Sequence, residues 1–293
     1  MKVARCIASV VLAAASMAAL GCGQSPQERT VLVYAFDIPA GQEGKPDIDK
    51  AVAVIDRRIN PVWSWNKTAR IRRVSEMALE VRLRTADPAA VMRIDRLLTA
   101  LGSLEFRVLA NDHDSRGIIE EAKTLKPDVN KLYSTSGKLE AWWVPVDPPS
   151  KEKFNYREIA RRTVTKNGQQ VLQILVVNDP FNVTGSYLTR VRSDVDEKGR
   201  PDVTFQLNSA GGRKFGGLTA THLPDEVTGF TRKLGIIFDG HLHSAPSIQS
   251  TIQDRGEITG SFTKRDTEDL ASVLNAGELP APLKKVSQRT EKP

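Results

Sequence analysis

The feature that most constrains the fold is the order of apolar patterns between residues 30 and 109. The run 30–38 is rich in apolar and branched residues and predicts a buried strand. Two stretches with apolar residues at helical spacing follow, each opened by an aspartate in an N-cap position, Asp47 and Asp87. Strands are predicted at 69–74, 78–84 and 104–109. The order β-α-β-β-α-β predicts a ferredoxin-like split module, an α+β fold with helices on one face of a sheet.

The N-terminus has the layout of a secretory signal. Lys2 and Arg5 precede an apolar run, 6–20, which is shorter than the roughly 20 residues that span a bilayer. The run closes on Ala-Leu-Gly before Cys22, which resembles a bacterial lipobox, although leucine is the family's residue where Ala19 stands. We expect residues 1–21 to be a lipoprotein signal peptide and 22–29 a tether. An ordinary cleaved signal and an uncleaved anchor are the alternatives.

Acylation of Cys22 would attach the chain to a membrane through two lipid chains, which is the number that stable anchoring requires. Gly23 stands where an inner-membrane lipoprotein would carry aspartate, and this resembles an outer-membrane address. The expected location is therefore the extracytoplasmic side of a membrane, facing the periplasm, with the outer membrane favoured.

Cysteine content and charge exclude several classes of protein. The chain has 2 cysteines, both in the N-terminal segment, so a disulfide scaffold or a thiolate metal site in the folded part is not expected. The formal net charge is +7, with basic residues spread along the chain and a cluster at Lys67, Arg70, Arg72 and Arg73. Outside the cytoplasm such a surface favours solvent or anionic lipid headgroups, and nucleic acid is not an expected partner.

The second half of the chain carries the most specific motifs. The stretch Leu234-Gly-Ile-Ile-Phe-Asp-Gly240 is followed by Ser244-Ala-Pro-Ser-Ile248, then by Ile258-Thr-Gly260 and by Gly277-Glu-Leu-Pro-Ala-Pro282. Together with 53–60 and 102–107 in the first half, these motifs resemble, in order, the first periplasmic (P1) domain of the SecD family, with its head subdomain.

The resemblance implies a ferredoxin-like base module at 30–110, followed by an α+β head-like module at 111–285 and a polar tail at 286–293. Within the head-like module, 111–182 is a variable, insertion-like part. After residue 20 no stretch reaches the length of a membrane span, so the family's transmembrane bundle has no counterpart. We therefore do not expect ion-driven transport by this chain alone.

Most of the conspicuous motif residues are expected to serve folding. Glycines 240, 256 and 260 are predicted at turns or bulges that need a positive φ, and prolines at edges and stops. Asp239 could be an acid or base, but beside Gly240 it is predicted to form a hairpin turn. The predicted structural residues of the motifs are Asp239, Gly240, Pro246, Gly256, Gly260, Gly277 and Pro280.

Enzyme chemistry has no positive signal in the sequence. His241 and His243 could share a strand face as a metal pair, but no third ligand is apparent, and turn positions are the simpler interpretation. Ser244 lacks a nucleophile-elbow context, and the glycine pairs at 211 and 216 do not form a P-loop. We predict no catalytic residue, no metal and no cofactor.

The favoured hypothesis is a non-enzymatic accessory of Sec-dependent protein export that binds translocating or newly exported unfolded polypeptide. Trp63, Trp65, Trp142 and Trp143 are the candidate contacts, although partly buried loop anchors are the favoured interpretation of these four residues. The Sec translocon or SecD/SecF-type membrane proteins are possible partners. The alternative function is a structural or envelope-interaction lipoprotein that reuses the fold without a role in export.

Overall fold

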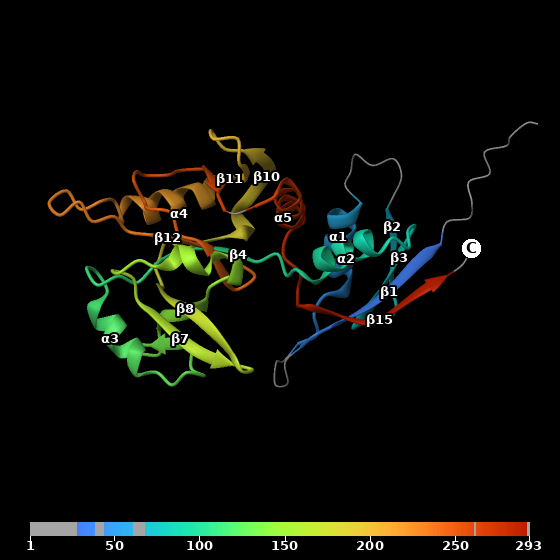
Figure 1. Ribbon diagram of the computed structural model, residues 1–293, viewed down its shortest axis with the longest axis horizontal. Coiled ribbons are helices and arrows are strands. Elements are labelled where there is room, and N and C mark those ends of the chain that lie inside the picture. Colours follow the sequence, from blue (N-terminus) through green and yellow to red (C-terminus); the bar gives the residue numbers. More distant parts are fainter. Residues whose placement is uncertain (1–27, 39–43, 61–67, 261, 292–293) are drawn as a thin grey trace, which may run out of the picture.

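The computed structural model describes residues 28–38, 44–60, 68–260 and 262–291. It is a mixed α+β fold, as expected, drawn out along one axis (Figure 1). One end holds a four-stranded sheet covered by two helices, here called the base. The rest forms the head, in which three further sheets pack with helices. The predicted signal, Cys22, Trp63 and Trp65 lie outside the described residues.

The base sheet has the strand order β15-β1-β3-β2, with all neighbours antiparallel. Its strands are β1 (Arg29–Phe36), β2 (Ala69–Arg73), β3 (Ala78–Leu83) and β15 (Leu283–Glu291). Two helices, α1 (Ile48–Ile59) and α2 (Pro88–Thr99), cover the face that points toward the head (Figure 1). This is the strand order of a ferredoxin-like module, with the fourth position filled from the C-terminal end of the chain.

The fourth strand of the base is a correction to the sequence prediction. The strand expected there is β4 (Leu104–Val108), but it pairs with β12 (Leu234–Phe238) and β9 (Val183–Thr184) in another sheet. Instead β15 pairs with β1, so the expected polar tail is strand as far as Glu291. Only the first residue of β15 is buried, and an exposed edge strand of this kind carries no alternating apolar pattern.

Both base helices form as their patterns predict. The carboxylate of Asp47 accepts the N–H groups of Asp49 and Lys50, and that of Asp87 accepts the N–H of Ala90. These contacts satisfy N–H groups that a helix start leaves free. The apolar stripes of both helices then pack on the inward side chains of the sheet. The buried side chains that α1 and α2 contribute are Ile48, Ala51, Val54, Ile55, Ile59, Val91, Ile94, Leu97 and Leu98.

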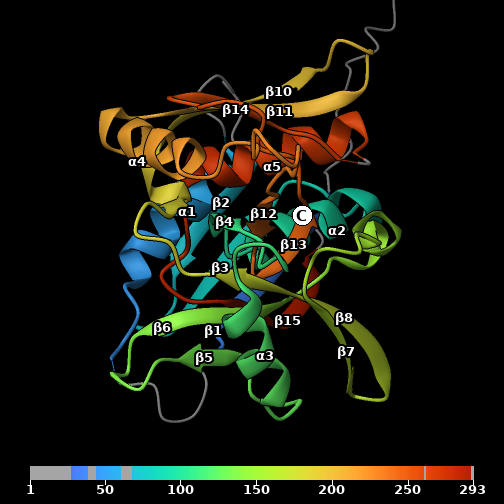
Figure 2. The same ribbon diagram turned by 90° about the vertical axis from the view of Figure 1, so that its left-hand side faces the viewer.

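The head contains three sheets stacked one above another (Figure 2). The central sheet has the order β13-β12-β4-β9, with β13 at His241–Ser244. On one side lies the sheet β10-β11-β14, with β10 (Leu188–Val195), β11 (Pro201–Leu207) and β14 (Arg255–Ile258). Helices α4 (Ser209–Ala220) and α5 (Lys264–Ala276) fill the space between these two sheets, and η2 (Gly185–Tyr187) leads into β10.

The core of this part of the head is built around three phenylalanines. The ring centroid of Phe106 lies 5.1 Å from that of Phe205 and 5.1 Å from that of Phe215, with tilted planes. Such tilted pairs add about 0.5–1.5 kcal/mol beyond the area they bury. The three rings come from β4, β11 and α4, so they tie the two sheets to the helix between them.

The variable part, 111–182, forms the third sheet, with the order β5-β6-β8-β7. Its elements are α3 (Arg116–Thr124), β5 (Lys131–Tyr133), β6 (Leu139–Pro145), the 3-10 turn η1 (Pro148–Phe154), β7 (Arg161–Lys166) and β8 (Gln169–Val177). Helix α3 covers one side of this sheet (Figure 2). The long β8 also lies against β4, which joins this sheet to the rest of the head.

The motif glycines serve different purposes. Gly240 follows Asp239 at the tip of the β12–β13 hairpin, and both have positive φ, 75° and 47°, as the Asp-Gly signal predicts. Gly256 and Gly260 do not have the positive φ that we expected. A Cβ at position 256 would lie 2.5 Å from the ring of Phe205 on the paired strand, so this glycine makes room for a core aromatic ring.

A small substitution at Gly256 should therefore disturb the core. We expect Gly256→Ala to lower the free energy of unfolding by about 1–3 kcal/mol, because the added methyl group overpacks against Phe205. The matched control is Gly117→Ala in α3, where a Cβ meets open space. That change should raise stability by up to about 1 kcal/mol through helix propensity. Urea unfolding measures both, and equal effects of the two substitutions would contradict the role assigned to Gly256.

Candidate functional site

The base and head meet at a buried arginine. Arg58 lies at the end of α1, is 2% exposed, and donates to carbonyl groups of the chain that leaves α2 and of the chain that leaves α5. The acceptors are the carbonyl oxygens of Leu97 at 2.9 Å, Leu101 at 3.0 Å, Gly277 at 3.0 Å and Ala100. Burial lowers the pKa of Arg58 to about 10, with Asp239 acting in the opposite direction, so the side chain is charged at neutral pH.

Asp239 completes the junction from the head side. Its carboxylate accepts the backbone N–H groups of Leu101 at 2.9 Å, Gly102 at 2.7 Å and Ser103 at 2.9 Å. Burial raises the pKa of this carboxyl group, and the three N–H donors and Arg58 oppose that effect. The residue predicted as a turn former thus also holds the chain between α2 and β4, from a hairpin far away in the sequence.

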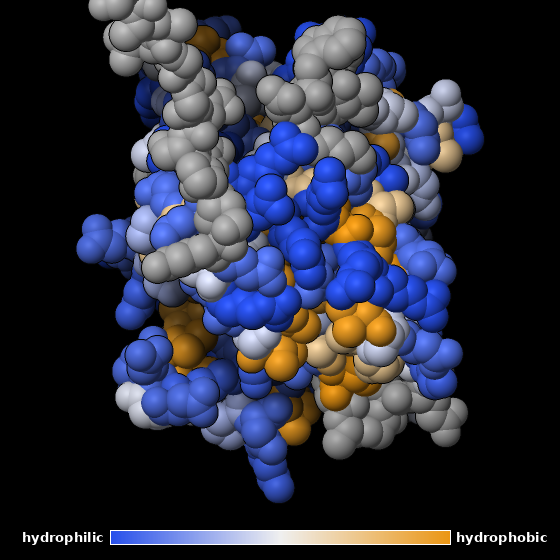
Figure 3. All heavy atoms as spheres, turned by 90° about the vertical axis from the view of Figure 1, so that its right-hand side faces the viewer, coloured by the Kyte–Doolittle hydropathy of each residue, from blue (hydrophilic) through white to orange (hydrophobic). Residues whose placement is uncertain are grey.

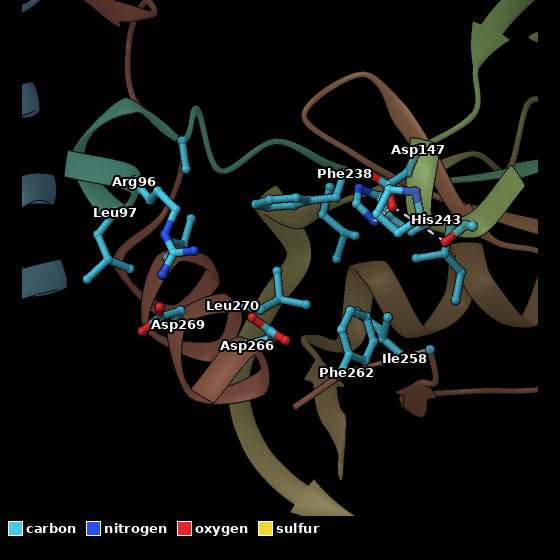
Figure 4. A pocket seen from close by; sticks show the side chains of 17 residues that line it. Arg96, Leu97, Asp147, Phe238, His243, Ile258, Phe262, Asp266, Asp269 and Leu270 are labelled. Atoms are coloured by element: carbon cyan, nitrogen blue, oxygen red, sulfur yellow. Dashed lines mark hydrogen bonds and ion pairs between the residues drawn. The ribbon is translucent and has the colours of Figure 1, made fainter. Parts of the chain in front are cut away.

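An apolar cleft opens beside this junction (Figure 4). Its volume is about 360 Å³, within the range of natural ligand sites, roughly 300–1,000 Å³. The walls come from α2, β4, β12, β14 and α5, so both base and head contribute. The apolar lining residues are Leu97, Ala100, Leu104, Ile236, Phe238, Ile258, Phe262, Leu270 and Val273.

Polar side chains stand at the rim of the cleft. Arg96 of α2, with Asp266 and Asp269 of α5, forms one side (Figure 4). Asp269 also accepts hydrogen bonds from Arg93 of α2, at 2.7 Å from Nε, and this ion pair joins the two helices. The rim therefore offers both a cation and carboxylates to the polar backbone of a bound molecule.

His243 and Asp147 form the opposite side of the cleft. Nδ1 of His243 lies 3.6 Å from a carboxylate oxygen of Asp147, and the imidazole meets the ring of Phe238 edge-on at 6.0 Å between centroids. Burial lowers the pKa of His243 below its usual value of 6.5, and Asp147 acts in the opposite direction. The imidazole is therefore neutral at pH 7, and Asp147 is the acidic group on this side of the cleft.

The two described tryptophans do not line the cleft. Trp143 is 2% exposed, its indole N–H donates to the carbonyl of Ala122 at 3.3 Å, and the guanidinium of Arg162 lies 4.7 Å from the ring centroid. Trp143 packs against α3 inside the third sheet, so its burial agrees with an anchor and does not offer a surface contact for polypeptide. Trp142 is half-buried, with the guanidinium of Arg107 at 4.9 Å from its ring centroid. Both lie in β6 and not in a loop.

The other motif residues lie where the chain turns or ends an element. Gly277 has φ 87° and ends α5, and the carbonyl of Pro246 accepts the N–H of Leu234. Gly260 lines the cleft, and Pro280 follows Leu279, whose N–H donates to Leu101. His241 is exposed and does not meet His243 at a shared ligand position. Among the described residues, no group of three or more His, Cys, Asp or Glu side chains is placed to hold a metal ion.

The cleft itself escaped the sequence analysis, because its lining residues are scattered over the chain. Phe238 lies inside the strongest motif, and Leu270 and Val273 lie on the stripe of a predicted helix, where apolar residues indicate core. One signal in the sequence could have pointed to the cleft. His243 and Phe262 lie beside motif residues but do not belong to the apolar pattern of a strand.

Comparisons with known proteins agree on one family. Residues 158–281 match the family model described as SecDF, P1 head subdomain. "Protein translocase subunit SecD" of Magnetococcus marinus is 34% identical over 146 residues, which cover 50% of this chain and 26% of that protein. The protein of the same name from Elusimicrobium minutum is 30% identical over 247 residues, covering 83% of this chain and 46% of that protein. The chain spans less than half the length of these relatives.

Solved structures agree with the fold. One, described as "Structure and function of a membrane component SecDF that enhances protein export", superposes with a TM-score of 0.55 at 23% identity. The match covers 88% of this chain and 98% of that chain. Within the described residues, no helix combines the length and the apolar content that crossing a bilayer requires.

The junction predicts a stability effect for an isosteric change. In Asp239→Asn, the asparagine has nearly the same shape as aspartate and tolerates the positive φ of residue 239. Its NH₂ group, however, cannot accept the hydrogen bonds that backbone N–H groups donate to the carboxylate. We expect the free energy of unfolding to fall by about 1–3 kcal/mol in urea titrations. The control is Asp194→Asn, an exposed aspartate that accepts the N–H of Val195, with an expected change within about 0.5 kcal/mol. A loss at Asp239 no larger than the control would refute the role of this carboxylate.

The cleft should lose affinity for apolar molecules in acid. His243 gains its proton only below its usual pKa, and the imidazolium then places a charge in the apolar wall. Binding of the neutral fluorophore 1-N-phenylnaphthylamine should therefore weaken several-fold between pH 7 and pH 5. His243→Gln should remove this pH dependence and His241→Gln should retain it. An unchanged pH profile in His243→Gln would show that another group is responsible.

Proposed function

The chain carries a SecDF P1 head subdomain on a P1-type fold and is related to SecD over most of its length, and from this premise we propose that it binds unfolded polypeptide during protein export. It would do so without enzymatic chemistry, as an accessory of the Sec translocation machinery. The proteins it resembles are named translocase subunits, and the solved relative is described as enhancing protein export. The role of this chain in that process is our proposal.

The observation that carries the proposal is the apolar cleft between base and head. Phe238, Phe262 and Leu270 give it walls that suit the apolar side chains of an unfolded segment, which a folded protein keeps buried (Figure 4). The charged rim then offers partners to the polar backbone between those side chains. This combination favours unfolded chains in general over one particular small molecule.

A sheet edge beside the cleft adds a second means of holding an extended chain. β14 is the last strand of its sheet, and Ile258 at its end lines the cleft. An edge strand presents backbone groups that pair with an added strand, and such pairing depends little on sequence. An extended segment could thus place side chains in the cleft and its backbone along β14.

The location follows from the proposed function. We propose that the chain is exported and held through acylated Cys22 on a membrane, facing the periplasm. There it would meet polypeptides as they leave the translocon, and SecD/SecF-type membrane proteins would be its natural neighbours. This placement rests on the signal and lipobox patterns in residues 1–22 and on the relationship to SecD.

A charge placed in the cleft tests the proposal. Leu270→Asp should weaken binding of a permanently unfolded protein, reduced and carboxymethylated α-lactalbumin, by at least tenfold, since a difference of about 1.4 kcal/mol suffices for that factor. The control is Val227→Asp, an apolar side chain that is 94% exposed and outside the cleft. It should bind as the parent does. Fluorescence anisotropy with labelled ligand measures the affinities, and native α-lactalbumin should not bind.

Two results would sink the proposal. One is the absence of binding to the unfolded ligand by the parent protein. The other is unchanged affinity in Leu270→Asp, with circular dichroism showing that the variant is folded. Stable envelope partners, together with a lack of affinity for unfolded chains, would instead favour an envelope-interaction lipoprotein.

A further inference from the structure

The base sheet has a second face, turned away from its helices and from the head. Leu32 and Tyr34 of β1 point into the helix-covered core, and the hydroxyl of Tyr34 donates to Asp95 of α2 at 2.6 Å. Side chains alternate along a strand, so Val31 and Val33 point to the other side. This surface, the outer face, carries the residues paired with those two valines on β3 and β15, and the β2 residues paired in turn with β3: Glu80, Arg82, Ser287, Arg289, Arg70 and Arg72.

Arginine dominates the outer face. The strand register places Arg70 directly opposite Arg82, and Arg82 and Arg289 on either side of Val31. Like charges in directly opposite positions destabilise a sheet. An arrangement of this kind is more favourable when an external anion lies over it.

The two acidic residues of the face, Glu80 and Glu291, already have arginine partners, and Glu291 lies 3.3 Å from Arg289. The carboxylate of Glu80 lies 2.8 Å from Arg82, 3.4 Å from Arg72 and 3.3 Å from Arg289, and the Glu80 side chain is 5% exposed. It therefore offers little further neutralisation. The guanidinium groups around it are 44–68% exposed, so an outside partner can reach them.

Apolar side chains lie among the charges. Val33 is half-buried between the arginine rows, and Val286 on the edge strand β15 is 64% exposed. Figure 3 views this end of the molecule and shows hydrophobic patches between strongly hydrophilic side chains. Long basic side chains over apolar ones suit the boundary between lipid headgroups and acyl chains.

The position of the face in the chain points to the same partner. β1 begins at Arg29, and Cys22 lies seven residues before it. Seven extended residues reach at most about 25 Å. Acylation at Cys22, as the lipobox predicts, would keep the base close to a bilayer while the head lies at the other end of the molecule (Figure 1).

We propose that the outer face of the base sheet docks on a bilayer containing anionic phospholipids, with the arginines on the headgroups and Val33 and Val286, but not the buried Val31, at the apolar boundary. The head and its cleft then point away from the membrane. This inference is independent of the proposed binding of polypeptide, since it concerns a different surface and a different ligand.

A single fluorescent label tests the contact. The full chain with Cys6→Ser and Cys22→Ser loses both native cysteines, and Ser287→Cys then carries an NBD fluorophore on the outer face. Vesicles of phosphatidylcholine alone are compared with vesicles containing about 30% phosphatidylglycerol. The N-terminal apolar segment is present in every sample, so the comparison isolates the effect of lipid charge.

We expect the emission to rise and shift to shorter wavelength on the anionic vesicles only, and the response to weaken at high salt, where charges are screened. The control label is Met92→Cys, on α2 and 63% exposed, which should not respond. Equal emission on both kinds of vesicle overturns the proposal. So does a response at position 92 with none at 287, because another surface would then make the contact.

Matched charge reversals complete the test. Arg70→Glu should weaken binding to the anionic vesicles by at least tenfold, because each basic residue near such a surface contributes roughly fivefold and the sign is reversed. Arg116→Glu makes the same change at an exposed arginine on α3 in the head and should stay within about twofold. Circular dichroism checks that both variants are folded. Equal losses in both would indicate a general charge effect and would contradict docking through the outer face.

Discussion

The arrangement of base and head depends on the hydrogen bonds that a few backbone N–H and carbonyl groups make at the junction. Where α2 and α5 end, carbonyl oxygens are left without helical partners, and buried groups of this kind are costly unless they are hydrogen-bonded. Arg58 supplies the donors from one guanidinium, and Asp239 accepts the N–H groups of the adjoining chain. Because the groups are charged and face each other across the same loop, each lowers the cost of burying the other. The cleft has walls from both parts because this junction holds them together.

Local patterns predicted much of the fold. Asp47 and Asp87 opened helices where expected, the Asp239-Gly240 pair formed the hairpin, and the motif-based relation to the SecD family is confirmed by the match over 158–281. These features are determined by residues that are close together in the sequence, so they can be predicted without a structure. The predicted domain boundaries, the lipid site and the polypeptide contacts remain predictions.

Long-range pairing was where prediction failed. The strand at 104–108 has the apolar alternation that any half-buried sheet would accept, so its pattern does not identify its partner. The strand 283–291 is almost wholly exposed, and polar edge strands resemble tails. Trp143 was expected in a turn-rich segment, whereas it lies in β6 and packs under α3, a contact between segments about 20 residues apart. The cleft draws on elements from both halves of the chain, and that information lies in tertiary structure alone.

The closure of the base sheet by β15 has a consequence for how the protein matures. β15, the neighbour of β1, follows the whole head in the sequence, so the head must be synthesised before the base sheet is complete. Until then β1 presents an unpaired edge next to an exposed apolar core, a state that attracts other strands. The edge of β1 is thus protected by a segment that lies more than 240 residues further along the chain, and any form of the chain that lacks residues 283–291 would leave that edge open to pairing with other strands.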